Sequence, residues 1–336
     1  MENSVYNCSP NSNWLSQFLK PALIIEFIIG SVGNGVALWI FCFRVKSWKA
    51  STVYLVNLAL ADFLLIFCLP FRTDYYFHNH NWVFGDAGCR VMLFMVSLNR
   101  AGSIVFLSVI AIDRFFKVVY PHHTINTTSS RGAAKISCLM WGLCLAMTAY
   151  LAAEPQESQQ NATVLCESFK LEAEIAGTQL WHVVFFIAEF FIPLVVIVFC
   201  TISISHQLRT RGMENNQKIR KALMSVQVVT VVFVLCFLPS TLSLIVLMIV
   251  KSMKDCTAYW VVGQVFYGSL ALTYFNSMLD PIVYYFSSPM FRNALKSAGS
   301  RQTGSAALQE ASVQNRRDPV QETATPPCSV PTSSSS

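Results

Sequence analysis

The sequence predicts an all-α membrane protein whose ordered part is a bundle of seven membrane-spanning helices. Hydrophobic residues make up 54% of the 336 residues and charged residues only 12%, about half of the quarter that soluble domains carry. The apolar residues are gathered into seven blocks of about 20 to 30 residues, which is the length that a helix needs to cross a bilayer. Seven such blocks in succession argue against buried helices of a large soluble protein. The blocks are 21–43, 52–76, 88–118, 133–153, 181–206, 219–250 and 258–286.

The seven blocks differ in how apolar they are. Span one follows a polar segment, 1–20, which lacks the basic and apolar regions of a cleavable signal peptide, so we expect the span to serve as its own insertion signal. Spans one, two, four and six are nearly uniformly apolar, whereas spans three, five and seven contain polar residues. Pro239 in span six and Pro281 in span seven permit kinks, which suit helices that pivot between two states. The segment 298–336 is rich in Ser, Thr, Gln and Pro and is predicted to be a disordered tail.

Charges in the loops predict the orientation. Basic residues follow spans one, three and five, and the densest group runs from Arg209 to Lys221. The loop 154–174 instead carries five glutamates and one lysine. Because Lys and Arg collect on the cytoplasmic side, we expect an extracellular N-terminus (1–20), a cytoplasmic tail and a place in the plasma membrane. The net charge of +6 reflects this bias and gives no reason to expect a nucleic-acid partner.

Four of the eleven cysteines fall in segments expected outside, where disulfides persist. An even number there predicts two bridges. We expect them to be Cys89–Cys166 and Cys8–Cys256. Two N-glycosylation sequons, at Asn7 and Asn161, lie in outside segments as well.

Polar side chains occur at comparable depth inside several spans. Two of them are carboxyls, and an ionisable group at membrane depth usually faces a partner or a wet cavity. Together they predict an interior pocket of oxygen ligands for a small hard cation such as Na⁺, or a proton-sharing cluster. Unrelated hydrogen bonds between helices are the third alternative. The residues expected in this pocket are Asp62, Asn99, Ser103, Asn276 and Asp280. We expect no other cofactor and no metal site.

Arg100 lies inside span three, where a lone guanidinium costs at least a few kcal/mol. It precedes Arg114 by fourteen residues and so lies about 21 Å nearer the outside, at the floor of an extracellular cavity. Arg72 lies near the outer end of span two, and two arginines facing one cavity suit a carboxylate or phosphate. Pairing within the chain, through Asp74 or Glu189, is the alternative. We expect Arg100 to lack an internal acid, so that the ligand's acid completes it.

Several motifs occur in a fixed order along 21–297. They are GNGVAL in span one, LALAD in span two, DRF after span three, CFLP in span six and DPIVYY in span seven. In these motifs the chain resembles the rhodopsin-like G-protein-coupled receptors, although Phe237 replaces the usual Trp and Asp280 the usual Asn. The resemblance implies a short amphipathic eighth helix, no enzymatic activity and a heterotrimeric G protein that docks when span six swings outward. The residues that it assigns to this switch are Asp113, Arg114, Phe237, Pro239, Asp280, Pro281 and Tyr284.

Longer stretches narrow the resemblance to one branch of that family. CLPFRTDYY, CRVMLFMVSLNRAGSIVFL, LCESF and LTYFNSMLDPIVYYFSSP look like the hydroxycarboxylic acid receptors and the oxoeicosanoid receptor. The resemblance implies that Arg100 binds the ligand's carboxylate with help from Ser168 and Tyr274, and that an inhibitory G protein (Gi/o class) lowers cyclic AMP. The uncharged stretch PSTLSLIVLMIV after Pro239 favours an oxidised long-chain fatty acid over a small hydroxycarboxylic acid such as lactate, because it offers an apolar wall.

Two further expectations complete the prediction. The hydroxyls of the tail suit phosphorylation, and the resemblance implies receptor kinases and arrestin as partners there; the basic inner loops suit anionic membrane lipid. An anion transporter or channel with Arg100 as its selectivity element is the alternative function. The odd number of spans and the absence of an internal repeat argue against it.

Overall fold

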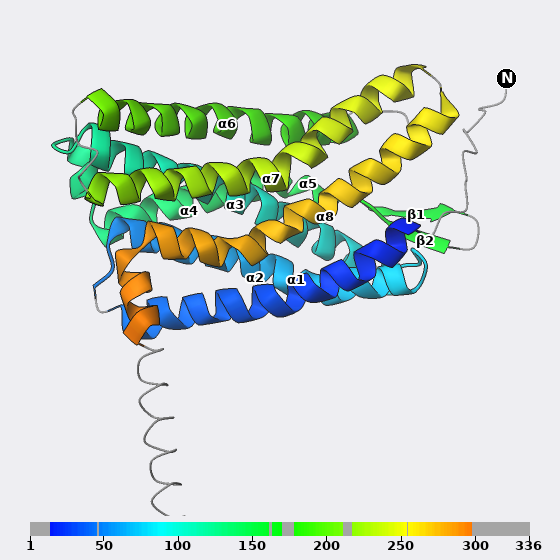
Figure 1. Cartoon of the computed structure of the whole chain (residues 1–336). Coiled ribbons are helices and arrows are strands. Elements are labelled where there is room, and N and C mark those ends of the chain that lie inside the picture. Colours follow the sequence, from blue (N-terminus) through cyan, green and yellow to red (C-terminus); the bar gives the residue numbers. More distant parts are fainter. Residues whose placement is uncertain are drawn as a thin grey trace, which may run out of the picture. The chain divides into compact units, whose positions relative to one another are not determined.

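Seven long helices lie side by side in the computed structural model (Figure 1), which describes residues 14–45, 47–160, 163–169, 178–210, 217–253 and 255–297. The bundle belongs to the first of two compact units, which ends at Arg292. The long helices are α1 (Trp14–Trp39, continued by a π-helical turn, Ile40–Arg44), α2 (Ala50–Phe77), α3 (Gly85–Val119), α4 (Ser130–Thr148), α6 (Thr178–Thr210), α7 (Gln217–Met253) and α8 (Cys256–Ser287). Shorter elements are a 3-10 turn (Thr124–Thr127), α5 (Tyr150–Ala153), β1 (Glu157–Gln160) and β2 (Thr163–Cys166).

Each of the seven predicted blocks coincides with one long helix, so the predicted fold class is confirmed. Within the described residues, five helices are long and apolar enough to cross a membrane by themselves: α1, α2, α3, α6 and α7. The other two complete the bundle by packing, α4 against α2 and α3, and α8 against α7 and α1. Large apolar side chains such as Phe67, Ile192 and Val195 are exposed on the outer faces, where lipid would cover them.

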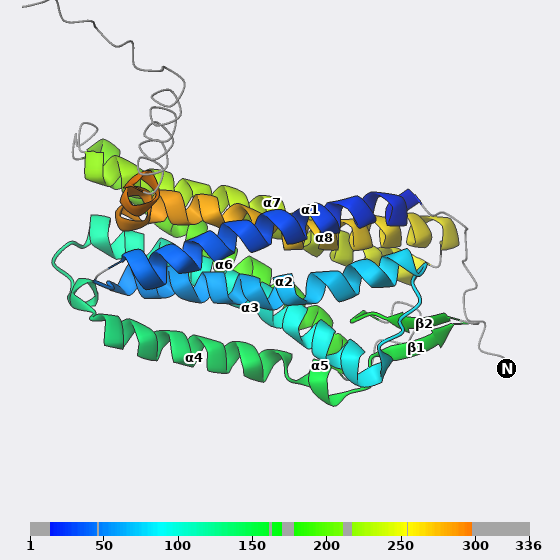
Figure 2. The same cartoon turned by 90° about the horizontal axis from the view of Figure 1, so that it is seen from below.

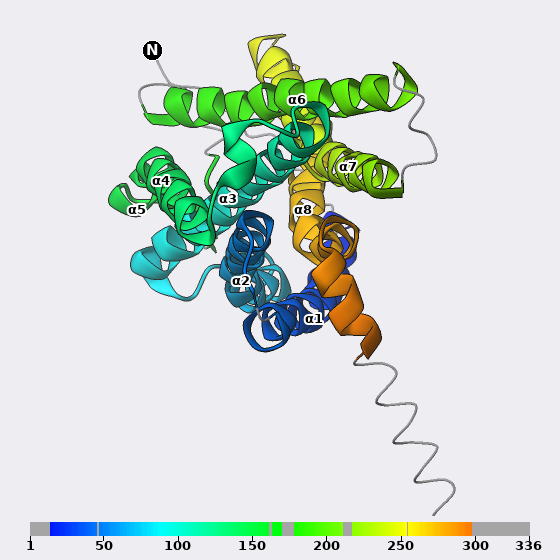
Figure 3. The ribbon, with the colours of Figure 1, turned by 90° about the vertical axis from the view of Figure 1, so that its left-hand side faces the viewer.

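Helix α3 occupies the middle of the bundle. Seen end-on, α1, α2, α4, α6, α7 and α8 are arranged around it (Figure 3); it packs mainly against α2 and α6, less against α4 and α7, and only slightly against α8. This position explains why its polar residues matter, because a side chain on α3 faces other helices rather than lipid. Asn99, Arg100 and Ser103 are all buried.

The glycine-containing motif of α1 permits a close approach to α8. A Cβ atom on Gly33 would lie 2.7 Å from Cγ of Pro281, which is closer than packed atoms tolerate. The absence of a side chain at Gly33 therefore lets the proline of α8 pack directly on α1. The neighbouring Asn34 then donates a hydrogen bond of 2.7 Å to the carbonyl of Ser277, one turn before that proline.

A β-hairpin covers the outer end of the bundle (Figure 2). Its strands β1 and β2 pair antiparallel, with Glu157 opposite Cys166. The predicted disulfide Cys89–Cys166 is confirmed: it joins the first turns of α3 to the end of β2, with the two Cα atoms 5.7 Å apart. Trp82, in the loop after α2, donates its backbone N–H to Val164 of β2 over 2.8 Å. The hairpin is thus attached to both α2 and α3.

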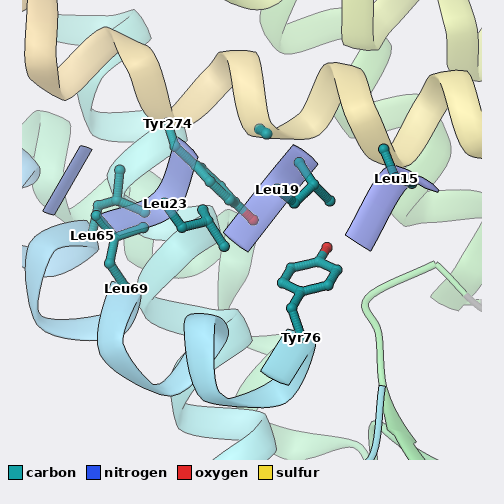
Figure 4. Packing of buried hydrophobic residues seen from close by; sticks show 8 residues of the cluster. Leu15, Leu19, Leu23, Leu65, Leu69, Tyr76 and Tyr274 are labelled. Carbon is teal, nitrogen blue, oxygen red and sulfur yellow. The ribbon is translucent and has the colours of Figure 1, made fainter. Parts of the chain in front are cut away.

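Leucines and tyrosines fill the outer part of the bundle between α1, α2 and α8. Tyr76 of α2 and Tyr274 of α8 point their hydroxyls into the same space, with the leucines around them (Figure 4). The leucines of this cluster are Leu15, Leu19, Leu23, Leu65 and Leu69. These contacts fix the wall on which the functional site is built.

A further helical segment, 289–297, follows α8 after a break at Ser288, in the place of the predicted eighth helix. Phe291 is buried there, and its ring centroid lies 5.3 Å from that of Phe41 in α1. Several predictions fall outside the described residues and stay predictions. These are the bridge Cys8–Cys256, glycosylation at Asn7 and Asn161, and the disordered tail 298–336.

Candidate functional site

A cavity of about 50 Å³ lies next to the hairpin, lined by α2, α3, α4, α5, α6, α8 and the segment after β2. By this measure a water molecule needs roughly 10–15 Å³, so the space holds about four waters. All four residues predicted to bind the ligand line it: Arg72, Arg100, Ser168 and Tyr274. The structure therefore brings these residues together, although they come from four separate parts of the chain.

Arg100 forms an ion pair with an acid of the same chain, so the prediction that it lacks an internal acid is wrong. Its Nε donates to Oε1 of Glu189 on α6, and both side chains are buried. Its two terminal nitrogens lie 3.3 Å from the Ser240 hydroxyl and 3.5 Å from the Thr241 hydroxyl. The ring of Phe186 covers the guanidinium, with its centroid 3.8 Å from Cζ. The structure shows the alternative that the sequence left open, an internal ion pair of Arg100 with Glu189.

The pairing of Arg100 follows from the packing of α3 against α6. A single arginine buried between helices is costly unless an acid neutralises it. Glu189 stands at the matching depth on the neighbouring helix, 89 residues along the chain. The sequence contained both residues but no signal that their helices would face each other at that level.

Arg72 is the cavity cation that retains an unused donor. Nη1 donates to the carbonyl of Cys166 over 3.1 Å, and Nη2 lies 3.5 Å from the hydroxyl of Tyr76. Among the described residues, Arg72 has no ion pair, and its buried Nε has no acceptor. Asp74, the other predicted internal partner, pairs with His78 instead, at 3.2 Å.

Aromatic rings and one distant acid hold Arg72 in place. Its guanidinium lies over the rings of Tyr75 and Tyr76, 5.2 and 5.3 Å from their centroids. Glu167 interacts with Arg72 electrostatically, while its carboxylate accepts hydrogen bonds from Tyr75 and Tyr267. These supporting residues were missed by the sequence analysis. Only the four-residue spacing of Arg72 and Tyr76, which places them on one helix face, could have indicated one of them.

His80, in the loop after α2, adds no positive charge beside Arg72. Burial, together with the charges of Arg72 and Lys20, lowers its pKa to about 4. Its ring packs edge-on against Tyr75 and Tyr76, at 5.3 and 5.0 Å. The histidine is therefore neutral at physiological pH and contributes packing against Tyr75 and Tyr76 rather than charge.

Comparison of the chain with known proteins shows its family. The family model described as "7 transmembrane receptor (rhodopsin family)" matches residues 33–284. The chain belongs to the rhodopsin family of seven-transmembrane receptors. It is 48% identical to human "Hydroxycarboxylic acid receptor 2" over 85% of this chain and 78% of that one. It is 48% identical to human "Hydroxycarboxylic acid receptor 1" (84% and 81%) and 40% identical to human "Oxoeicosanoid receptor 1" (84% and 73%).

Membership confirms the predicted branch and several coarser predictions. The protein is a multi-pass membrane receptor and not an enzyme, and as a receptor of this family it acts through a G protein and a small-molecule ligand. In the described residues, no group of three or more His, Cys, Asp or Glu side chains is placed to hold a metal ion. The remaining polar residues of the bundle can now be considered as parts of a receptor.

The interior polar residues of the receptor form two groups, one around Asp62 and Asp280 and one on α3. Both oxygens of Asp62 accept hydrogen bonds, from the hydroxyls of Ser277 (2.7 Å) and Tyr284 (2.8 Å). Asp280 lies close enough to Asp62 to interact with it and accepts a bond of 2.9 Å from Asn276. Asn99 and Ser103 of α3 lie 3.4 Å apart, and Asn99 also donates to the carbonyl of Ala61. The residues predicted for the pocket thus come from α2, α3 and α8.

At the end of the bundle away from the hairpin, Arg114 has a closer partner than the predicted one. The ion pair with Asp113 is present but long, at 3.6 Å, because the Asp113 carboxylate is engaged by Lys117 (2.8 Å) and Ser51 (2.9 Å). Arg114 donates instead to the carbonyl of Ser287, at the end of α8, over 2.7 Å. No motif pointed to Ser287, since a backbone acceptor carries no sequence signal.

Ser287 also connects α8 to α7. Its hydroxyl lies 2.7 Å from that of Ser225, and both are buried. Ser287 therefore joins α3, α7 and α8 at this end of the bundle. Phe237 and Pro239, which the resemblance assigns to the switch, lie four turns further out on α7, and Phe237 is fully buried with its ring centroid 5.4 Å from that of Phe233.

Replacing Ser225 by alanine is expected to raise ligand-independent activity. The change removes a buried hydrogen bond worth about 1 kcal/mol, which corresponds to roughly a fivefold shift between closed and open forms. Nucleotide exchange on added G protein, measured without ligand, checks this. Ser252→Ala is the control, because Ser252 is an exposed serine of α7 that bonds only to its own helix, at the carbonyl of Ile249. Equal basal rates in the Ser225 variant and the wild type would contradict the role given to Ser287.

Proposed function

We propose that the protein is a G-protein-coupled receptor for a ligand with a carboxylate, and that Arg72 binds this carboxylate. The observation that carries the proposal is the buried Nε of Arg72, which lacks an acceptor among the described residues in a cavity large enough for a small molecule. A buried donor without an acceptor costs about 1–3 kcal/mol, and more when it is charged. A ligand carboxylate removes that cost on binding.

The charges around the cavity support a ligand with one negative charge. Its lining residues include two cations, Arg72 and Arg100, and one acid, Glu189. One positive charge is therefore left over among them, which a single carboxylate neutralises. Tyr274 interacts electrostatically with Arg72, and Ser168 lines the same space, so both are within reach of a ligand held by Arg72.

The size of the cavity supports a short acid over a long one. A volume of about 50 Å³, with room for roughly four waters, favours a short acid over a long fatty chain. Identity points the same way, at 48% to two hydroxycarboxylic acid receptors and 40% to the oxoeicosanoid receptor. We therefore propose a small hydroxycarboxylic acid, with the oxidised long-chain fatty acid expected from the uncharged stretch after Pro239 as the second candidate.

On the inner side, we propose that the receptor activates a G protein of the inhibitory class and lowers cyclic AMP. The resemblance described in the sequence analysis and the basic residues that follow spans one, three and five support this assignment. The same proposal includes an extracellular N-terminus, because the acidic loop and the disulfide Cys89–Cys166 lie at the end of the bundle that carries the cavity. Receptor kinases and arrestin are the proposed partners of the tail.

The interior cluster fits a sodium ion as a regulator. Asn276 and Asp280 each present a buried oxygen that has no donor among the described residues, and small hard cations bind such oxygens. Asp62, Asp280, Asn276 and the hydroxyl of Ser103 would hold the ion. A cation there would offset the repulsion between the two neighbouring carboxylates.

The test of the proposed function is ligand-stimulated nucleotide exchange by the full-length receptor in lipid nanodiscs with an inhibitory-class G protein. Lactate, 3-hydroxybutyrate, nicotinate and an oxo-eicosanoid form the panel, and their methyl esters are the matched controls. We expect a short acid to be active and its ester to be roughly 10- to 150-fold weaker, since a hydrogen bond to a charged group contributes about 1.5–3 kcal/mol. Esters as potent as the acids, or anion flux through receptor liposomes without nucleotide exchange, would refute the proposal.

A further inference from the structure

Glu189 already occupies the guanidinium of Arg100, in the place where a ligand's carboxylate could bind. The two side chains are 8% and 7% exposed, and both line the cavity. We propose that Glu189 is an internal competitor: the carboxylate that Arg72 attracts into this cavity also reaches Arg100 and displaces Glu189 from it, and this exchange opens the link between α3 and α6. The inference rests on the proposed function and adds to it how binding is regulated.

The geometry of the pair favours such an exchange. Within the part of the chain that the structure describes, Glu189 accepts through a single oxygen, from Nε of Arg100. The hydrogen-bond partners of the terminal nitrogens of Arg100, among the same residues, are the hydroxyls of Ser240 and Thr241, at 3.3 and 3.5 Å. Both hydroxyls already donate to the carbonyl of Phe237, at 3.0 Å each. An incoming carboxylate can bind an arginine through two parallel hydrogen bonds, so it can compete with a one-point contact.

The displaced carboxylate needs a new donor, because a buried charge left unpaired is costly. Tyr150 lines the same cavity and interacts electrostatically with Glu189. Its hydroxyl can supply that donor. The weaker pairing of Glu189 with a neutral hydroxyl keeps the original ion pair favoured in the absence of ligand, so the exchange happens only when the ligand's acid compensates Arg100.

The exchange takes place next to α7, the helix that Pro239 permits to bend. Arg100 contacts α6 through Glu189 and Phe186, and α7 through Ser240 and Thr241, which directly follow Pro239. Its Cζ lies 5.2 Å from the ring centroid of Phe237. A change of acid at Arg100 therefore alters contacts on both sides of the proline that permits α7 to bend.

The experiment compares wild type and Glu189→Gln in the nanodisc exchange assay, with lactate, 3-hydroxybutyrate and nicotinate as probes. Glutamine keeps the shape but removes the competing charge. We expect the potency of the active acid to rise by roughly tenfold, together with a higher rate without ligand. Glu26→Gln is the matched control, since Glu26 is a buried acid of α1 that does not line the cavity; its potency should stay within about twofold.

The outcomes separate this inference from the proposed function. If no acid stimulates the wild type, the proposed function fails and this inference with it. If the wild type responds but Glu189→Gln is equally or less sensitive at matched surface expression, the inference alone fails. Should glutamine prevent surface expression, Glu189→Asp takes its place, because it withdraws the carboxylate from Arg100 by one methylene. It should also raise potency, and a fall would overturn the competitor role.

Discussion

Replacing Arg72 by glutamine is expected to reduce the potency of carboxylate ligands by roughly 30- to 1,000-fold. Removing one partner of a buried, hydrogen-bonded charge pair costs about 2–4 kcal/mol. Here the lost partner is the cavity cation with an unused donor. Dose–response curves for nucleotide exchange measure the effect, with surface expression determined in parallel. Replacement by lysine should recover only part of the response, because a point charge lacks the planar fork that lies over Tyr75 and Tyr76.

The control for this change is Arg90→Gln. Arg90 lies on the outer end of α3, is partly exposed and pairs with Asp86 four residues away, and it does not line the cavity. Its loss should leave potency within about twofold, because surface pairs contribute little. If Arg72→Gln matched this control while Arg100→Gln abolished the response, the ligand's main anchor would be Arg100 and the role given to Arg72 would be wrong.

Replacing Cys166 by serine is expected to lower both stability and ligand response. The bridge to Cys89 closes a loop of 77 residues, and the chain-entropy model gives about 4 kcal/mol of stabilisation for loops of that size. The Cys166 carbonyl is also the acceptor that holds Nη1 of Arg72, and Ser168 and Phe169, just beyond it, line the cavity. Once the loop is released, the binding groups are no longer held in place.

Thermal unfolding of the purified receptor and the nucleotide-exchange assay test this together. Cys89→Ser should reproduce the Cys166 variant, because each change breaks the same bond. Cys138→Ser is the control, since Cys138 is an exposed free cysteine of α4. An unfolding temperature and a potency equal to those of the control would show that the disulfide is not needed to position Arg72.

The two predictions test two parts of the Arg72 site, its charge and the disulfide that positions it. Arg72 supplies the charge, and the disulfide-linked segment supplies its position, because a backbone carbonyl of that segment holds the arginine, which has no ion pair among the described residues. This choice of partner matters for binding. A carbonyl orients the guanidinium without neutralising it, whereas Glu189 neutralises Arg100. Arg72 is thus available to a ligand, whereas Arg100 becomes available only when a ligand displaces Glu189.

Much of the fold and part of the site could be predicted from the sequence. The apolar blocks specified the seven helices, because a helix in lipid satisfies its backbone hydrogen bonds internally and needs only length and apolar side chains. Depth could also be counted along each helix at a fixed rise per residue. This is why Arg72 and Arg100 were expected to face one cavity, and why Asp62, Asn99 and Asp280 were expected in one layer. Ser168 and Tyr274 were expected at the site only from the resemblance to known receptors.

The partner of each charge was decided only by the tertiary structure. Asp74, two residues from Arg72, was a candidate on sequence distance, but residues two apart on a helix point to different sides, and Asp74 pairs with His78. Glu189 reaches Arg100 because α3 packs against α6 at the matching depth. Arg114 meets the carbonyl of Ser287, which no side-chain motif encodes. Periodicity and composition act along one helix, whereas an ion pair depends on how two helices rotate and slide against each other, and that is set by all their contacts together.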